Sequence, residues 1–271
     1  MSSEPSSRAL KYRANNRISK RTTECDLESR ITYLDRETAP KGIGLSFRVG
    51  TPGPEKELVE RFVRECSIPV PKNCEVTVFC EPRLESGFPD LVIVIWDRAL
   101  TEKWQMQRCA LKTSDLRLVQ LLRLSGPLST AQLSEFCVDN LDSALLRLRA
   151  ADLIVSRKGK WVTRPLSKAF AIKRIIAIEA KISDWGVALT QARLNMWFAD
   201  QSYVLMPRVP DTETFRASFR SHGIGVIKHG LESRIVARAR TRRAASGPRS
   251  FAAWQFNEWV WRASITELGS T

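Results

Sequence analysis

A carboxylate and an ammonium group lie two residues apart at the end of an apolar run in the middle of this sequence. The run extends from Arg174 to Lys181 and ends with Glu179, Ala180 and Lys181. Its composition predicts a β-strand, and side chains i and i+2 of a strand point to the same face, so Glu179 and Lys181 should lie side by side. Mg²⁺ takes oxygen ligands from one or two carboxylates, and a lysine can assist a nucleophilic water. The pair therefore suits chemistry on a phosphate with a divalent metal.

A second carboxylate stands at the start of another apolar stretch. Asp90 follows Pro89 and precedes Leu91 to Trp96, which we also expect to be a strand. If the two strands pair, Asp90 and Glu179 converge on one ion. The alternative is that Glu179 and Lys181 form an ordinary ion pair at a strand end.

The Pro-Asp strand followed by a strand ending in acid-x-Lys resembles the PD-(D/E)xK nuclease superfamily. The segments 184–192 and 199–207 are similar to the helix and strand that follow the lysine in that family. The resemblance implies hydrolysis of phosphodiester bonds with Mg²⁺, or with Mn²⁺, and it implies that Asp90, Glu179 and the carbonyl of Ala180 hold the metal. It also implies that Lys181 assists the attacking water and that Gln191 orients substrate or water.

The family often adds a glutamate from a helix that precedes these strands. Residues 55–66 have the apolar spacing of an amphipathic helix, after a break at Pro52, Gly53 and Pro54. We expect Glu57 to be the further ligand or base, with Glu60 as the alternative, and both could equally be solvated charges on the outer face. Residues 74–80 alternate enough to predict a strand before the Pro-Asp strand.

The long segment between the two motifs predicts a module of its own. Helical patterns cover residues 114–124, 129–136 and 140–151, and residues 153–163 predict a β-hairpin with a basic turn. Three short helices and a hairpin resemble a winged helix-turn-helix, whose third helix often enters the major groove while the wing touches phosphates. The candidate DNA contacts are the helical residues Ser143, Arg147 and Arg149 and the hairpin residues Arg157, Lys158 and Lys160. Such modules also contact proteins, which is the alternative.

Composition favours a polyanionic partner. The 271 residues are 43% hydrophobic and carry a net charge of +14, so DNA is the first candidate, and a merely cationic surface is the alternative. The six cysteines form no Cys-x-x-Cys motif, which favours reduced thiols over a zinc site. There is no apolar stretch of membrane-spanning length and no signal-peptide core, so we expect a cytoplasmic protein without a membrane partner.

These patterns predict an α/β fold: a restriction-endonuclease-like mixed sheet flanked by helices, with an inserted winged helix-turn-helix. We expect a basic N-terminal arm at residues 1–50, the core at 51–112 and 165–245, the insert at 113–164 and an aromatic C-terminal helix at 246–271. A strand is expected at 223–227, followed by an arginine-rich edge strand from Arg234 that either faces DNA or is simply solvated. The tryptophans of the C-terminal helix are expected in the core or at a partner contact.

The function expected from the resemblance is a metal-dependent DNA endonuclease, in defence or mobile-element biology. One alternative is a catalytically inactive winged-helix DNA-binding regulator. Another is a protein-interaction subunit of a nuclease complex that uses the tryptophan-rich C-terminus as its contact. The sequence leaves open a homodimer or a larger complex.

Overall fold

A computed structural model describes residues 30–39, 42–66, 68–85, 87–136, 140–231, 233–242, 248 and 250–268. The basic cluster from Lys11 to Arg21 in the expected N-terminal arm lies outside the described residues, as does Arg243. Within the described ranges, every helix is too short or too polar to cross a membrane.

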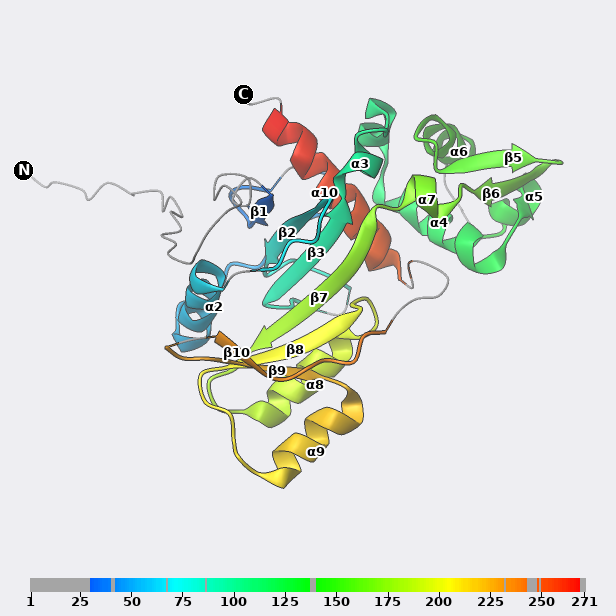
Figure 1. The fold of residues 1–271 in the computed structure, drawn as a ribbon. Helices are drawn as coiled ribbons and strands as arrows, with labels where there is room; N and C mark the ends of the chain where they lie inside the picture. Colours follow the sequence, from blue (N-terminus) through cyan, green and yellow to red (C-terminus); the bar gives the residue numbers. More distant parts are fainter. Residues whose placement is uncertain are drawn as a thin grey trace, which may run out of the picture.

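A seven-stranded mixed sheet forms the centre of the molecule, with the order β1-β2-β3-β7-β8-β9-β10 (Figure 1). The neighbours β2/β3, β3/β7 and β9/β10 are antiparallel, whereas β1/β2, β7/β8 and β8/β9 are parallel. The strands are β1 (Ile31–Leu34), β2 (Cys74–Cys80), β3 (Leu91–Asp97), β7 (Ile172–Ala180), β8 (Gln201–Met206), β9 (Gly225–His229) and β10 (Ser233–Ala237). Strands β3 and β7 are therefore neighbours despite the long segment between them in the sequence.

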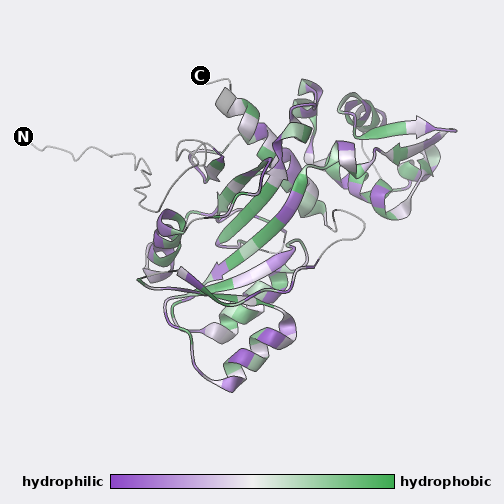
Figure 2. Cartoon of the chain, in the orientation of Figure 1, coloured by the Kyte–Doolittle hydropathy of each residue, from purple (hydrophilic) through white to green (hydrophobic). Residues whose placement is uncertain are grey.

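Helices cover both faces of this sheet. Helix α2 (Pro54–Glu65) packs on one face, and α8 (Trp185–Asn195), α9 (Glu213–His222) and α10 (Phe251–Leu268) pack on the other. Burial on both sides explains why β3 is apolar along its whole length, since alternate residues pack against α2 and against α10. Figure 2 shows the hydrophobic strands in the centre and hydrophilic residues on α2 and α9. The fold is thus mixed α/β, with a large mixed sheet flanked by helices.

Helix α10 lies in the core of the molecule. The side chains of Trp254, Phe256 and Trp259 are at most 1% exposed. The indole nitrogen of Trp254 donates to Gln120 Oε1 at 2.9 Å, and that of Trp259 donates to the carbonyl of Ile43 at 3.1 Å. The C-terminal tryptophans are therefore core residues, the first of the two placements expected for them.

The segment between β3 and β7 contains a second, smaller sheet. Helices α4 (Thr113–Ser125), α5 (Thr130–Ser134) and α6 (Leu141–Ala150) accompany three strands in the order β4 (Leu128–Ser129), β6 (Lys160–Thr163) and β5 (Ile154–Arg157). The Ser129 hydroxyl accepts from the Gln132 backbone N–H and caps α5. Short helices α3 (Arg98–Thr101), η1 (Met106–Ala110) and α7 (Leu166–Ala169) join this segment to the main sheet.

Part of the expected N-terminal arm belongs to the core. Residues Ile31–Leu34 form β1, which pairs in parallel with β2, and Ile43 is 5% exposed. An arm that extends to residue 50 is therefore wrong for the described residues of this stretch. Residues Ile31–Leu34 join the sheet because their backbone groups form hydrogen bonds with the edge of β2 that would otherwise be unpaired.

Candidate functional site

The two motif strands lie side by side and bring their acidic residues together. Leu91 pairs with Ile178 in the β3/β7 register, so Asp90 and Glu179 occupy the next opposing positions. The backbone N–H of Ala180 donates to Asp90 Oδ2 at 2.7 Å. The structure thus holds the two carboxylates next to each other, on the face of the sheet that α8 covers.

Burial and neighbouring carboxylates determine the protonation of these acids. Glu179 is 4% exposed, and its Oε1 accepts from Asn195 Nδ2 of α8 at 2.5 Å. Desolvation and the neighbouring Asp90 raise the pKa of Glu179 to about 8. Desolvation also raises the pKa of Asp90, although the Ala180 N–H and Lys181 act in the opposite direction. The buried Glu179 and the partly buried Asp90 therefore do not readily carry two negative charges together.

Lys181 follows the last residue of β7 and reaches the start of α2. Its backbone N–H donates to the carbonyl of Leu205 at 3.0 Å, and its Nζ lies 2.7 Å from Glu55 Oε2. The helical glutamate at the site is therefore Glu55. Glu57 is exposed, because it lies two residues further around the helix, at about 200° from Glu55. The other candidate, Glu60, pairs with Lys56 at 3.9 Å.

A third acid and an arginine extend the site across β2. Glu81 lies opposite Asp90 by continuation of the β2/β3 register, and its backbone N–H donates to the Asp90 carbonyl at 2.9 Å. Arg48 lies between the two side chains, with Nε 2.6 Å from Glu81 Oε2 and Nη2 3.5 Å from Asp90 Oδ1. The hydrogen bond to Glu81 raises the pKa of the Arg48 guanidinium. Glu81, Asp90 and Glu179 thus form an acidic row across β2, β3 and β7.

Sequence reasoning missed four of these residues, namely Arg48, Glu55, Glu81 and Asn195. Arg48 lay in the segment expected to be an arm, and Glu81 directly follows a predicted strand, as Asp90 directly precedes one. The spacing of Asn195, four residues after Gln191 on one helical face, was a signal that could have identified it.

Gln191 lies on α8, one turn before Asn195 and therefore closer to the loop that joins β7 to α8. Its Oε1 is buried and has no hydrogen-bond partner among the described residues. A buried acceptor without a partner is rare in folded proteins. The atom is thus available for a donor such as water.

The structure separates the expected DNA contacts into two groups. Arg147 is held by Asp115, with its Nε and Nη2 each 2.7 Å from a carboxylate oxygen, and Asp115 is fully buried. Arg147 is therefore a structural residue and not a free phosphate contact. The expected contacts that remain exposed, two on α6 and three at the tip of the β5/β6 hairpin, are Ser143, Arg149, Arg157, Lys158 and Lys160.

The donor set limits the kind of metal that this site could hold. Among the described residues, there is no group of three or more His, Cys, Asp or Glu side chains placed to bind a metal ion. The four cysteines in those ranges, Cys66, Cys74, Cys80 and Cys109, are free thiols. Two adjacent carboxylates suit Mg²⁺, because this ion usually completes its coordination shell with oxygens of water and substrate.

Neither a protein-family model nor a curated protein matches this sequence. Among solved structures, the chain is similar to the SPO1766 protein of unknown function from Silicibacter pomeroyi, with 15% sequence identity over 44% of this chain and 80% of that one. The TM-score is 0.24, so the similarity carries no argument about fold or function.

Proposed function

We propose that this chain is a metal-dependent nuclease that hydrolyses phosphodiester bonds in DNA, built on a restriction-endonuclease-like core of the PD-(D/E)xK type. The observation that carries the proposal is the juxtaposition of Asp90 and Glu179 on adjacent strands, with Lys181 two residues after Glu179 at the end of β7. The strand pairing supports it because the two motifs are far apart in the sequence and meet only through the β3/β7 register.

Asp90, Glu179 and the carbonyl of Ala180 would hold Mg²⁺ or Mn²⁺ in this proposal. The bound ion would supply Lewis acidity and lower the pKa of a nucleophilic water. A cation bound at this point would favour the ionised forms of both acids, whose pKa values are raised by burial in the metal-free protein.

Lys181 and Gln191 would act on the attacking water. The ion pair with Glu55 positions the Lys181 ammonium at the carboxyl end of β7. The unpaired Oε1 of Gln191 would accept a hydrogen bond from water or substrate. Glu55 would orient the lysine, and it reaches the site instead of Glu57, which the sequence suggested as a further ligand or base.

We further propose that residues 113–164 form a winged helix-turn-helix that binds the DNA duplex. The order of helix, short strand, two helices and hairpin supports this assignment, as does the separate three-stranded sheet. Helix α6 would approach the major groove through Arg149. Arg157, Lys158 and Lys160 would contact phosphates from the hairpin.

A cleavage assay with a matched lysine control tests the nuclease. Supercoiled and linear DNA are incubated with the purified protein and Mg²⁺ or Mn²⁺, with EDTA in a parallel reaction. We expect cleavage that EDTA abolishes and that Lys181→Ala slows by about 10²- to 10⁴-fold, the usual contribution of a proton-transfer group. Lys173→Ala, an exposed change on the same strand, should cleave at the normal rate. Metal-dependent cleavage that is equally fast in Lys181→Ala would contradict the assigned role of the lysine.

A DNA-binding regulator with an inactive core is the second candidate. The observation that favours it is the position of Arg48, whose guanidinium already neutralises part of the acidic row. DNA that is bound but not cleaved with either metal, by the wild type and by Arg48→Ala alike, would support the regulator.

A further inference from the structure

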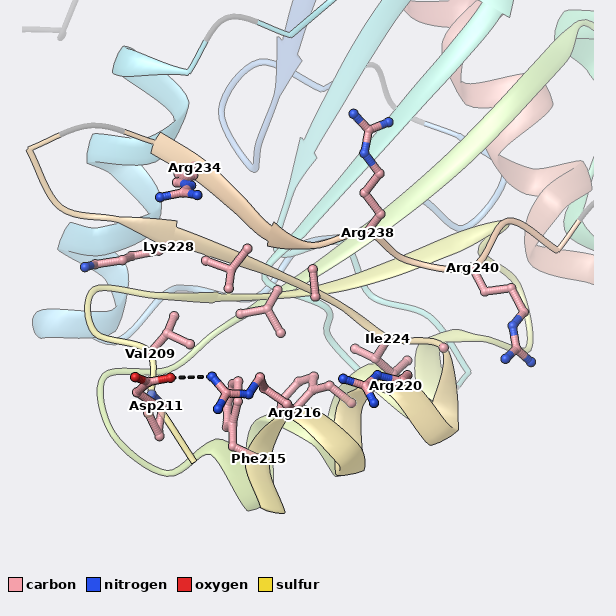
Figure 3. A pocket seen from close by; sticks show the side chains of 16 residues that line it. Val209, Asp211, Phe215, Arg216, Arg220, Ile224, Lys228, Arg234, Arg238 and Arg240 are labelled. Atoms are coloured by element: carbon pink, nitrogen blue, oxygen red, sulfur yellow. Dashed lines mark hydrogen bonds and ion pairs between the residues drawn. The ribbon is translucent and has the colours of Figure 1, made fainter. Parts of the chain in front are cut away.

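A positively charged groove lies between α9 and the β9/β10 edge of the sheet, away from the acidic row (Figure 3). The cavity has a volume of about 710 Å³. We call it the basic groove, and its charged lining residues are Arg216, Arg220, Lys228, Arg234, Arg238, Arg240 and the single carboxylate Asp211. Asp211 is already paired with Arg216, so the lining has a large excess of positive charge.

The placement of these cations costs stability in the free protein. Lys228 and Arg234 occupy directly opposite positions in the β9/β10 register, and like charges opposite each other destabilise a sheet. Arg216 and Arg220 lie one turn apart on α9, and both use Glu213 as a counter-ion. No ion pair joins Lys228, Arg234 or Arg240 to any carboxylate in the described part of the chain. Their charge is therefore available to an anionic ligand.

Regular elements hold the groove in shape. Its floor contains Phe215, Phe219 and Val226, which are at most 2% exposed and pack α9 on the sheet. The backbone N–H of Arg240 donates to the carbonyl of Gly223 at 2.9 Å, which fixes the chain after β10 to the end of α9. Gly223 adopts a φ of +69°, and a Cβ there would lie 2.9 Å from the Arg240 Cβ, so glycine permits this close approach. Figure 3 shows Arg238 directed away from α9, which extends the positive surface past β10.

One end of the groove lies at the same edge of the sheet as the candidate site. Ala180, Leu205 and Ile227 are in register across the parallel strands β7, β8 and β9, and Lys228 follows Ile227. Two strand spacings therefore separate Lys228 from the end of β7, a lateral distance of about 10 Å. Ligands of open α/β sheets bind outside the carboxyl ends of such strands. A chain of phosphates could run from the acidic row to the groove along this edge.

We propose that the basic groove binds the phosphodiester backbone of a nucleic acid and holds the strand that flanks the bond at the acidic row. This inference deepens the proposed function and rests on it for the second half of the statement. Phosphate is the favoured ligand because several arginines converge with a lysine, and arginine forks match phosphate geometry. Sequence preference is not expected, because contacts to the backbone carry no sequence information.

Binding in EDTA tests the groove without requiring cleavage. We would measure the affinity of labelled duplex DNA, single-stranded DNA and single-stranded RNA of equal length by fluorescence anisotropy over a range of salt concentrations. The variant is Lys228→Ala/Arg234→Ala, in which both changed residues are exposed. The control is Lys103→Ala/Arg36→Ala, which removes the same two charges from exposed positions elsewhere. Thermal unfolding should show the groove variant to be at least as stable as the wild type, since an unfavourable charge pair is gone.

We expect the groove variant to bind about tenfold more weakly, with a log-log salt slope smaller by about two, because each lost phosphate contact removes one released counterion. The control should bind like the wild type. The nucleic acid whose affinity falls most in the groove variant is the polymer that occupies the groove. Unchanged affinity and slope on all three polymers would overturn the proposal, and so would an equal loss in the control, which would reflect net charge alone. If the groove variant loses binding while the wild type cleaves nothing with Mg²⁺, the nuclease proposal fails and the groove stands.

Discussion

Asp90 is partly buried and lies next to the buried Glu179, and the electrostatics of these two acids are the central feature of the site at the scale of single residues. Asp90 Oδ2 accepts a hydrogen bond from the Ala180 backbone, and Glu179 Oε1 accepts one from Asn195. These hydrogen bonds favour the ionised forms, yet burial dominates and raises both pKa values, with a further rise for Glu179 from the charge of Asp90 and for Asp90 from that of Glu81. The metal-free protein is therefore less stable at alkaline pH, where both acids must ionise. A bound cation would remove this loss of stability.

Glu179 should make the stability of the metal-free protein depend on pH. Its ordinary pKa is 4.5 and its value in the fold is about 8, so between these pH values the folded protein keeps a proton that the unfolded chain has lost. Stability should consequently fall as the pH rises from about 4.5 to about 8 and then level off. We expect Glu179→Gln, which retains an acceptor for Asn195, to be more stable than the wild type at pH 8 by about 1–3 kcal/mol.

Urea unfolding in EDTA at pH 5, 6.5 and 8 measures this difference. The two proteins should converge near pH 5, where Glu179 is protonated in the fold. Glu37→Gln, at an exposed glutamate, should follow the wild type throughout. A difference between Glu179→Gln and the wild type that stays constant over the three pH values would show that Glu179 does not titrate in this range.

At the scale of elements, a buried ion pair joins α4 to α6 in the small sheet-containing segment. Asp115 accepts from the Lys112 backbone at 2.8 Å, which caps α4, and it also accepts from both Nε and Nη2 of Arg147. Arg147, which the sequence suggested as a DNA contact, therefore already uses its side-chain donors to bind Asp115. An arginine on an amphipathic helix can satisfy a buried acid or a phosphate, and only the packing of α6 on α4 decides which.

Arg147→Ala should destabilise the protein, whereas Arg149→Ala should not. The first change leaves the fully buried Asp115 with only its backbone donor, at a cost of about 3 kcal/mol. Arg149 lies two residues along the same helix and is exposed, so its removal affects contacts with a ligand and not folding. Denaturant unfolding of both variants checks this prediction. Equal stability of Arg147→Ala and the wild type would return Arg147 to the set of free DNA contacts.

For the whole molecule, α10 ties distant parts of the chain together. Arg108 of η1 and Glu258 of α10 form a buried ion pair with a closest approach of 2.5 Å, and both are at most 1% exposed. Arg108 also stacks over Trp104 at 3.4 Å and donates to the Ala169 carbonyl at 3.1 Å. The C-terminal helix thus links both ends of the segment inserted between β3 and β7.

Glu258→Ala should be among the most destabilising single changes in this chain, by about 3–5 kcal/mol, because it leaves the buried charge of Arg108 without its carboxylate partner. The exposed ion pair between Arg98 and Glu102 provides the comparison, and Glu102→Ala should cost less than about 1 kcal/mol. Thermal and denaturant unfolding measure both. A loss in Glu258→Ala as small as that in Glu102→Ala would mean that α10 docks through its tryptophans alone.

Local patterns in the sequence were sufficient to predict many elements. The predicted strand at residues 74–80 matches β2, the run after Asp90 matches β3, and the arginine-rich edge strand matches β10. Helix α9 escaped prediction, because its apolar positions are few and centre on Phe215 and Phe219. Periodicity and turn chemistry act within a few residues, so the sequence determines them directly.

The sequence by itself determined that Asp90 and Glu179 stand at the ends of apolar strands, since burial of a strand requires a nearly continuous apolar run. Only the tertiary structure decided that these strands are neighbours, that Arg48 and Glu81 extend the acidic row, and that Glu55 meets Lys181. Those contacts depend on sheet register and helix docking between segments far apart in the chain. No local pattern encodes such pairings, because they are set by the packing of the whole core.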